Sequence, residues 1–353
     1  MQKINDVYIN GRKVGSPCYV IAEIGVNFNG DMVLAKKTID AAISAGADAV
    51  KFQTFSSDEV VADRDLMYTY TQSDGTTVTE SQYEMFKRLE LPYEWHIILK
   101  KYAESKGADF MTSVADINAV DLVEEIGVSV LKTASENLIN IDLLNHMASK
   151  RLPVILSTGM ASYDEIDNAV SIFKNAGCEE LVILHCVSSY PTPFDQCNLN
   201  RIKALRDTYG YPVGFSDHTE GWEAPMLAAA AGACMVEKHF TLDKNLPGPD
   251  HRFSTDPAEF AKMVQMIRKA ETIMGKEGLH YADIEAKGRD EYRRSIVSAH
   301  DLKKGTVLTL SDITYKRPGY GMKPYERDRI LGKKLNKDIP KTTRLSPEDF
   351  DNV

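Results

Sequence analysis

Polar side chains gather late in, or just after, six short apolar segments of this sequence. The residues concerned are Glu23, Lys51, Gln53, Lys132, Ser157, Ser216, His218, Glu237 and His239. Within each segment they alternate with apolar neighbours, so in extended chain they would share one face. A chance distribution would not put acids, lysines, serines and histidines at the same point of six segments. The pattern indicates an enzyme.

Two lysines and a set of hydroxyl groups suggest an anionic substrate. Lys51 and Lys132 supply the positive charge, and the hydroxyl donors are Thr112, Ser113, Ser135, Ser157 and Ser216. Converging cations and donors of this kind suit a small phosphorylated or carboxylated molecule. The competing interpretation is that one lysine is a buried partner of Glu23 or Glu237.

Two histidines lie 21 residues apart, at the ends of what would be neighbouring strands. His218 and His239 would then be close enough to bind one metal ion, with positions left for water and substrate oxygens. Glu237 could complete the ligand set or orient a histidine from behind. The alternative is that both are ordinary core histidines.

Several turn-rich segments could carry further site residues. The segment 246–251 (LPGPDH) is rigid enough to hold Asp250 over a site, 188–193 (SSYPTP) presents Tyr190, and 317–322 (RPGYGM) presents Arg317. Ordinary surface turns are the alternative for each. The long segment 54–91 is either a functional loop or a cover for one rim.

The elements that would position these residues alternate regularly. Eight β-rich runs are predicted, at 19–24, 49–53, 109–113, 130–134, 153–157, 181–186, 212–216 and 235–240. Helical patterns follow, for example at 32–46, 93–107, 117–127 and 164–177, several of them ended by glycine. Eight such pairs predict an α/β fold of the (β/α)8 TIM barrel type, whose active sites lie at the carboxyl ends of the strands. A doubly wound open sheet is the alternative, although no GxGxxG motif follows a strand.

After residue 275 the helical patterns give way to short β-rich stretches with turn residues. We expect a catalytic barrel over residues 1–280, a linker at 281–293 and a small β-rich domain at 294–353.

Composition excludes several classes of protein. The 353 residues are 43% hydrophobic and 26% charged, as in ordinary globular proteins. The net charge of −9 argues against a general binder of nucleic acid or of anionic membranes. Five scattered cysteines and the lack of an apolar leader or a membrane-spanning run predict a cytoplasmic protein with reduced thiols.

Several motifs together resemble the N-acetylneuraminate (sialic acid) synthase family, which includes legionaminic acid synthases. They are IAEIGVNFNGD (21–31), KFQTF (51–55), STGM (157–160), LHCVSSYPTP (184–193), GFSDHT (214–219), EKHFTLDK (237–244), PGPDH (247–251) and KRPGYG (316–321). The resemblance covers nearly the whole chain in order. It implies a (β/α)8 barrel followed by an antifreeze-like (SAF) domain.

The resemblance also implies an activity and a set of roles. Such enzymes condense phosphoenolpyruvate with N-acetylmannosamine or a related N-acylated sugar and release phosphate. Phosphoenolpyruvate would be held by Lys51, Gln53, Lys132, Ser135, Ser157 and Ser216, and the sugar by Tyr190, Asp250 and Arg317. His218 and His239 would bind Mn²⁺ or Mg²⁺. The SAF domain would be swapped within a homodimer, so that Arg317 would enter the partner barrel.

Two departures from the family pattern bear on the chemistry and the sugar. The segment 132–137 reads KTASEN, which places Glu136 one position early and leaves Glu23 or Glu136 as the candidate base. Ser188 replaces an asparagine common in sialic acid synthases, a form associated with other sugars such as legionaminic precursors. The PGPDH loop argues against the pseudaminic branch.

Two other functions compete with this one. Lys132 could form a Schiff base with pyruvate in a metal-free aldolase. Alternatively, the barrel could be inert and the small domain could bind carbohydrate or ice. The polar rim argues against the second of these.

Overall fold

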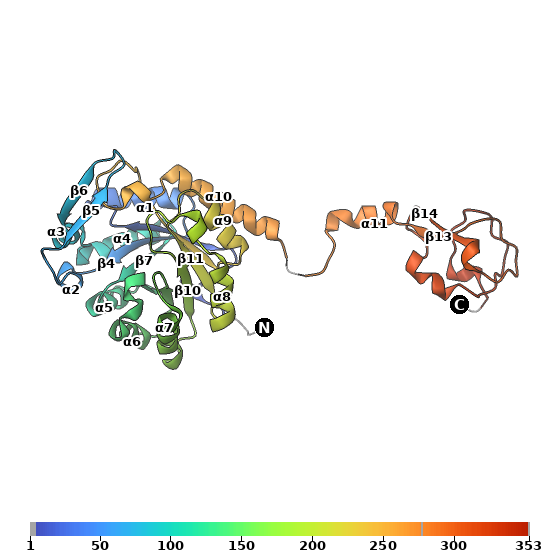
Figure 1. The fold of residues 1–353 in the computed structure, drawn as a ribbon, viewed down its shortest axis with the longest axis horizontal. Coiled ribbons are helices and arrows are strands. Elements are labelled where there is room, and N and C mark those ends of the chain that lie inside the picture. Colours follow the sequence, from blue (N-terminus) through green and yellow to red (C-terminus); the bar gives the residue numbers. More distant parts are fainter. Residues whose placement is uncertain (1–4, 277, 352–353) are drawn as a thin grey trace. The chain divides into compact units, whose positions relative to one another are not determined.

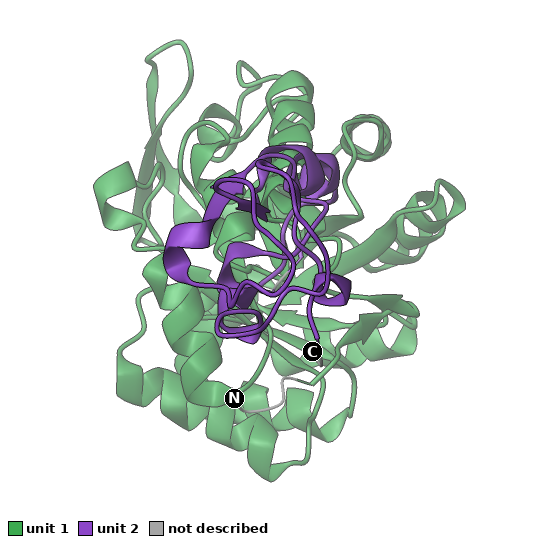
Figure 2. Ribbon diagram, turned by 90° about the vertical axis from the view of Figure 1, so that its right-hand side faces the viewer, with its two compact units in different colours: residues 1–275 green, residues 276–353 purple. Residues whose placement is uncertain are grey.

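The computed structural model describes residues 5–276 and 278–351. It divides into two compact units, Met1–Gly275 and Lys276–Val353 (Figure 2). Each unit has its own apolar core, and each is described by itself.

The first unit is a closed parallel barrel (Figure 1). Eight strands form it within the described residues: β3 (Tyr19–Gly25), β4 (Ala49–Thr54), β7 (Asp109–Val114), β8 (Leu131–Thr133), β9 (Val154–Ser157), β10 (Leu181–Cys186), β11 (Val213–Asp217) and β12 (Met235–His239). Each strand pairs with the next in sequence, and β12 pairs with β3. All eight predicted strands are confirmed, and the open-sheet alternative is wrong.

Helices cover the outside of the barrel, one after each strand. They are α1 (Met32–Ser44), α4 (Tyr93–Ser105), α5 (Ile117–Glu125), α6 (Ile141–Ser149), α7 (Tyr163–Asn175), α8 (Asn200–Tyr209), α9 (Glu223–Ala230) and α10 (Pro257–Met274). Their starts follow capping rules: Ser162 and Glu165 form a capping box on α7. Along α10, Phe260, Met263 and Ile267 are buried at helical spacing, which directs one face onto the strands.

A short hairpin closes the amino-terminal end of the barrel. Strands β1 (Tyr8–Ile9) and β2 (Arg12–Lys13) pair antiparallel. Ile9 and Val14 join the same buried cluster as Ile21, which points into the barrel. The amino half of the barrel is therefore filled with apolar side chains, and only the carboxyl end is left for polar ones.

The long connection after β4 has structure of its own. It contains α2 (Ser57–Val60), β5 (Met67–Thr71), β6 (Thr77–Ser81) and α3 (Gln82–Leu89). Arg88 makes a two-pronged ion pair with Glu80 at 2.9 and 3.0 Å, and Tyr70 donates to Glu80 at 3.0 Å. Ser73, in the turn of the hairpin, donates to the backbone oxygen of Lys244. The β5–β6 hairpin is thus fixed at its base and at its tip.

The second unit is small and has few regular elements. Strands β13 (Ser295–Ser298) and β14 (Ile313–Lys316) pair antiparallel, and short bridges and 3₁₀ turns enclose a separate apolar cluster. The segment expected to be a linker carries a 3₁₀ turn, η4 (Asp283–Glu285), and helix α11 (Ala286–Tyr292).

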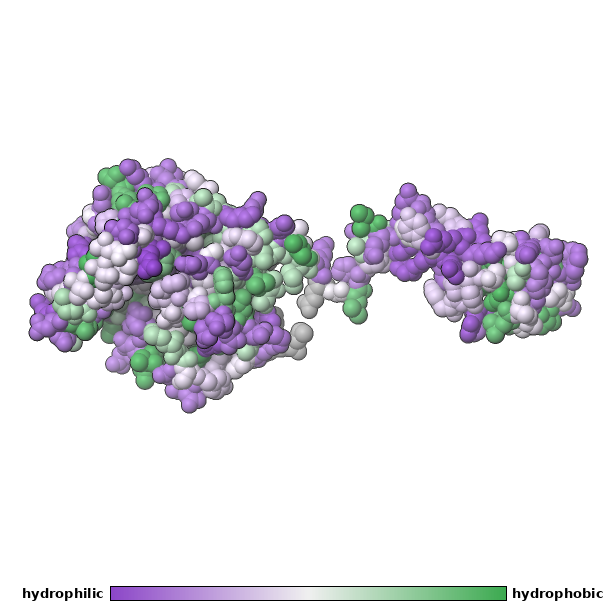
Figure 3. Space-filling model, turned by 45° about the horizontal axis from the view of Figure 1, so that its top comes forward, coloured by the Kyte–Doolittle hydropathy of each residue, from purple (hydrophilic) through white to green (hydrophobic). Residues whose placement is uncertain are grey.

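The surfaces of both units are mixed in character. Figure 3 shows hydrophilic side chains over most of the visible face of each unit, with apolar ones scattered among them. Among the described helices, none has both the length and the apolar character needed to cross a membrane.

Candidate active site

A cavity of about 720 Å³ lies at the carboxyl ends of the barrel strands. It brings together most of the residues predicted from the sequence: Glu23, Lys51, Gln53, Ser113, Lys132, Ser135, Glu136, Ser157, Ser188, Tyr190, Ser216, His218, His239 and Asp250. Strands β3, β4, β8 and β12 supply its buried charges Glu23, Lys51, Lys132 and Glu237, and the segments that follow β8, β11 and β12 supply Glu136, His218 and Asp250. A polar cavity of this size, at this end of a barrel, is where this fold places chemistry.

Thr112 and Arg317 have other surroundings. The Thr112 side chain is fully buried, and its hydroxyl lies 2.8 Å from Thr54 Oγ1 instead of facing the cavity. The alternation of side chains along β7 explains this, because Ser113 faces inward. Arg317 belongs to the second unit, where its Nε donates to the backbone oxygen of Tyr292 at 2.9 Å.

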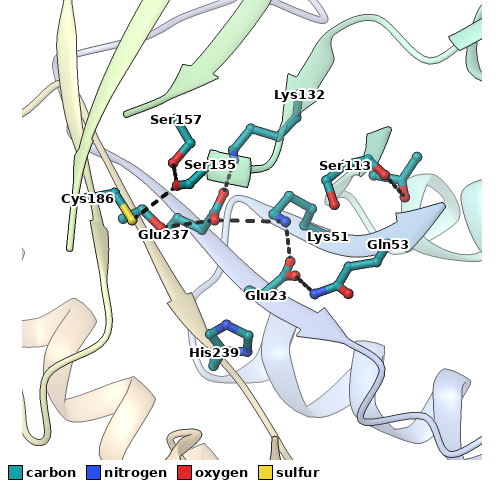
Figure 4. Close-up of polar contacts among 12 residues, drawn as sticks. Glu23, Lys51, Gln53, Ser113, Lys132, Ser135, Ser157, Cys186, Glu237 and His239 are labelled. Atoms are coloured by element: carbon teal, nitrogen blue, oxygen red, sulfur yellow. Dashed lines mark hydrogen bonds and ion pairs between the residues drawn. The ribbon is translucent and has the colours of Figure 1, made fainter. Parts of the chain in front are cut away.

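Four buried charges form the floor of the cavity (Figure 4). Lys51 Nζ lies 2.7 Å from Glu23 Oε2 and 3.8 Å from Glu237 Oε1. Lys132 Nζ lies 3.7 Å from Glu237 Oε2. Gln53 donates to Glu23 at 3.0 Å. Glu237 lies between the two lysines, so the interpretation that a lysine is a buried partner of Glu23 or Glu237 is confirmed.

The surroundings of these charges shift their pKa values in different directions. Burial raises the pKa of Glu23, and the charge of Glu237 adds to this against the opposing effect of Lys51. Burial also tends to raise the pKa of Glu237, but Lys132 and Lys51 outweigh it and hold the value below normal. Burial lowers the pKa of Lys132, whereas for Lys51 the two glutamates overcome the effect of burial and raise the pKa. Of the two acids of this floor, Glu23 therefore holds a proton more readily, and Glu237 more readily stays ionised.

A row of hydroxyl groups lies beside the lysines. Ser135 Oγ and Ser157 Oγ are 2.9 Å apart, and the backbone nitrogen of Gly159 donates to Ser135 Oγ at 3.1 Å. A Cβ atom at position 159 would overlap the hydroxyl oxygens of Ser135 and Ser188. Glycine is thus required here for close approach. The row gives the floor donors that an anion can use without further positive charge.

Two histidines stand above the floor, next to an aromatic pair. The ring centres of His218 and His239 are 5.6 Å apart. The Tyr190 ring lies 4.1 Å from that of His218, and the Phe253 ring lies 5.2 Å from that of His239. Asp250 Oδ2 approaches His239 Nδ1 to 3.9 Å, and burial raises the pKa of Asp250 to about 7.

The two imidazoles fit a divalent metal. His218 Nδ1 lies 2.8 Å from the carbonyl oxygen of Val187, which fixes the ring and leaves Nε2 as the lone-pair nitrogen. His239 Nδ1 is buried without a hydrogen-bond partner, and burial holds the pKa of this histidine well below normal. A buried, neutral imidazole with an unsatisfied nitrogen is suited to a metal. No cluster of three or more His, Cys, Asp or Glu suited to a metal occurs among the described residues, so the pair would make an open site.

One wall of the cavity is apolar and comes largely from the long connection after β4. Phe55, Tyr70, Met85 and Phe86 line it together with Val26. The segment 54–91 therefore contributes directly to the cavity. Its role was left open by the sequence, because its exposed tyrosines and threonines are equally typical of a surface hairpin. Arg252 and Glu220 also line the cavity and were not predicted.

The chain is similar to known proteins over nearly its whole length. Residues 38–278 match the NeuB family and residues 293–351 match the SAF domain. An N,N'-diacetyllegionaminic acid synthase of Legionella pneumophila is 42% identical over 98% of this chain and 97% of its own, and one of Campylobacter jejuni is 37% identical over 90% and 96%. The crystal structure of an N-acetylneuraminic acid synthetase from Leptospira borgpetersenii in complex with citrate has 36% identity and a TM-score of 0.73, covering 81% of this chain and 95% of its own.

Proposed function

Because this chain belongs to the NeuB family, whose relatives are nonulosonic acid synthases, we propose that it condenses phosphoenolpyruvate with an N-acylated mannosamine-type sugar. The observation that carries the proposal is the floor of the cavity, where Lys51 and Lys132 are buried beside a row of hydroxyl groups. Such a floor suits a small molecule that carries both phosphate and carboxylate.

The proposed reaction forms one carbon–carbon bond and releases phosphate. Carbon 3 of phosphoenolpyruvate attacks the aldehyde carbon of the open-chain sugar, and the aldehyde oxygen takes up a proton. Water adds to carbon 2, losing a proton, and the resulting intermediate loses phosphate by cleavage of its bond between carbon and oxygen. The product is a 2-keto acid three carbons longer than the sugar.

We assign roles to the residues from their chemistry. Lys51 and Lys132 bind the phosphate and carboxylate and stabilise negative charge through the reaction, an effect that is large in a buried site. Glu23, with its raised pKa, takes the proton from the attacking water, and Glu136 is the alternative base. Tyr190 and Asp250 contact the sugar. A divalent metal held by His218 and His239 would act as a Lewis acid toward the aldehyde oxygen.

For the acceptor sugar we propose 2,4-diacetamido-2,4,6-trideoxymannose in preference to N-acetylmannosamine, the first expectation from the sequence. Two full-length relatives named as diacetyllegionaminic acid synthases support this choice, as does Ser188. The apolar wall is a second argument, because a 6-deoxy sugar presents a methyl group where N-acetylmannosamine presents a hydroxymethyl group. A methyl group packs against Phe55 and Phe86 without losing a hydrogen bond. A hydroxyl at this wall would have to find its partner among side chains such as Thr69 and Thr71.

Arg317 and the homodimer extend the proposal beyond the barrel. We propose that Arg317 of the SAF domain completes the sugar site of a partner barrel within a swapped dimer. A chain truncated after residue 275 would then keep binding of phosphoenolpyruvate and lose sugar turnover. Recovery of turnover on adding the full-length Lys132→Met variant would support the exchange, and full turnover by the truncated chain alone would refute it.

The test of function is phosphate release from phosphoenolpyruvate with each of the two sugars, with Mn²⁺ and after chelation. We expect metal-dependent release with both sugars and a higher kcat/KM with the diacetamido sugar. The reverse preference would make the protein a sialic acid synthase. No release with either sugar would refute the reaction, and trapping of Lys132 by borohydride in the presence of pyruvate would indicate the Schiff-base aldolase instead.

A further inference from the structure

A buried ion pair lies on the outer face of the barrel wall, directly behind the two histidines. Asp217 is the last residue of β11, and it pairs in register with Lys238 of β12. Both side chains are almost completely buried, and Lys238 Nζ lies 2.5 Å from Asp217 Oδ2. Side chains alternate along each strand, so this pair points away from the cavity while His239 points into it.

Thr219 closes the pair into a small network. Lys238 Nζ also donates to the backbone oxygen of Thr219 at 2.6 Å. The backbone nitrogen and hydroxyl of Thr219 donate to the two carboxylate oxygens of Asp217 at 2.9 and 3.2 Å. Asp217, Thr219 and Lys238 are called the outer clamp below.

The outer clamp acts where the backbone ladder between the two strands ends. The last paired residues of β11 and β12 are Asp217 and Lys238, so His218 lies just beyond the ladder. Asp217 directly precedes His218 in the sequence and Thr219 directly follows it. Both of these residues accept a hydrogen bond from Lys238. Lys238 in turn immediately precedes His239, which is held in β12 by pairing with Glu23 of β3. The clamp therefore connects the backbone around one histidine to the backbone beside the other.

We propose that the outer clamp consists of positioning residues that set the separation and orientation of His218 and His239 for a shared divalent metal. The inference rests on the proposed function only in that these two histidines hold the metal. A buried ion pair is weak evidence for stability, because its desolvation offsets much of the attraction between the charges. Its place behind the histidines gives it a specific role, since groups behind metal ligands commonly change metal affinity by about 10- to 100-fold.

The test measures Mn²⁺ binding directly, by titration calorimetry in the absence of substrates. In Asp217→Asn/Lys238→Met the ion pair is removed, no buried charge is left unpaired, and the amide can still accept from Thr219. We expect its Kd for Mn²⁺ to rise about 10- to 100-fold while its thermal midpoint stays close to that of the wild type. Thr219→Val is a milder variant of similar volume, for which we expect a rise of a few fold.

A control removes a more exposed ion pair elsewhere in the same barrel. Arg268 and Asp48 pair at 3.2 Å beside the amino-terminal ends of β3 and β4. We expect Asp48→Asn/Arg268→Met to lower the thermal midpoint and leave the Kd for Mn²⁺ within about twofold of wild type.

Three results would overturn the proposal. They are an unchanged Kd in a folded Asp217→Asn/Lys238→Met variant, an equal loss of affinity in the Arg268 control, and a wild-type protein that binds no Mn²⁺. If the double variant does not fold, the Kd of Thr219→Val for Mn²⁺ becomes the test. An unchanged Kd in that variant refutes the role of the outer clamp. Phosphate release by the wild type is measured separately, so failure of the clamp is distinguishable from failure of the proposed function.

Discussion

The four charges of the cavity floor predict that two substitutions change the affinity for phosphoenolpyruvate in opposite directions. Lys51, Lys132, Glu23 and Glu237 cancel in formal charge when all are ionised. Lys132→Met removes a cation that we expect to contact phosphoenolpyruvate. A hydrogen bond to a charged group contributes about 1.5–3 kcal/mol, so the Kd should rise about 10- to 150-fold.

Glu237→Gln should act in the other direction. It removes a negative charge 3.7 Å from Lys132 and 3.8 Å from Lys51 and leaves the floor with a net positive charge. The amide oxygen introduced by this substitution can still accept from Ser216, which donates to Glu237 Oε1 at 3.2 Å. We expect this variant to bind phosphoenolpyruvate at least as tightly as the wild type. Lys132→Met/Glu237→Gln restores neutrality, and its affinity should lie between those of the single variants.

The assay is titration calorimetry with phosphoenolpyruvate and no sugar, so that no turnover occurs. Folding is followed by the fluorescence of Trp95 and Trp222, the two tryptophans of the chain, which both report on the barrel unit. If the folded Glu237→Gln variant loses as much affinity for phosphoenolpyruvate as Lys132→Met does, the charges of the floor stabilise the fold and do not bind the ligand. A Lys132→Met variant within about threefold of wild type would refute its contact with the anion.

Three further predictions concern single residues. Burial lowers the pKa of His251 from its ordinary 6.5 to about 4, so below pH 6.5 the unfolded chain binds a proton that the folded chain does not. His251 should therefore contribute about 2 kcal/mol to the fall in stability between pH 7 and pH 5 in urea unfolding, and a wild-type pH dependence in His251→Gln would contradict this. Because burial raises the pKa of Glu23, kcat/KM should decline as pH drops through that raised value. This decline should vanish in Glu23→Gln and persist in Glu136→Gln, and the opposite pattern would make Glu136 the base. His239→Ala should lose Mn²⁺ binding and phosphate release together, whereas full activity under chelator would disprove the metal site.

The barrel could be predicted because its strands are continuous apolar runs, as parallel strands buried on both faces must be. Ser157 and His239 stand at the carboxyl ends of their strands, and Glu23, Lys51 and Lys132 lie one to three residues before the ends of theirs. The position of these polar residues in the sequence is therefore enough to predict the floor of the cavity. Motif resemblance added Ser188 and gave roles to Tyr190 and Asp250, for which the turn-rich segments alone left ordinary surface turns as the alternative, and all three line the cavity.

Other features depend on contacts between segments distant in sequence. Thr112 and Ser113 are equally polar neighbours, and only the register of β7 decides which one faces inward. The apolar wall and the outer clamp have no local signature, since Phe86 and Lys238 look like ordinary surface or core residues until the fold places them. The β1–β2 hairpin was also missed, because its paired strands are only two residues long.

That hairpin has a kinetic consequence. Because apolar side chains around Ile9 and Ile21 fill the amino half of the barrel, substrates and products must enter and leave at its carboxyl end. The lysines that would hold phosphoenolpyruvate are almost completely buried in the floor of the cavity, with Lys51 3% and Lys132 2% exposed. Under the proposed function, phosphoenolpyruvate must enter before the sugar covers it. Binding should therefore be ordered, and excess sugar should inhibit competitively against phosphoenolpyruvate by occupying the empty enzyme first.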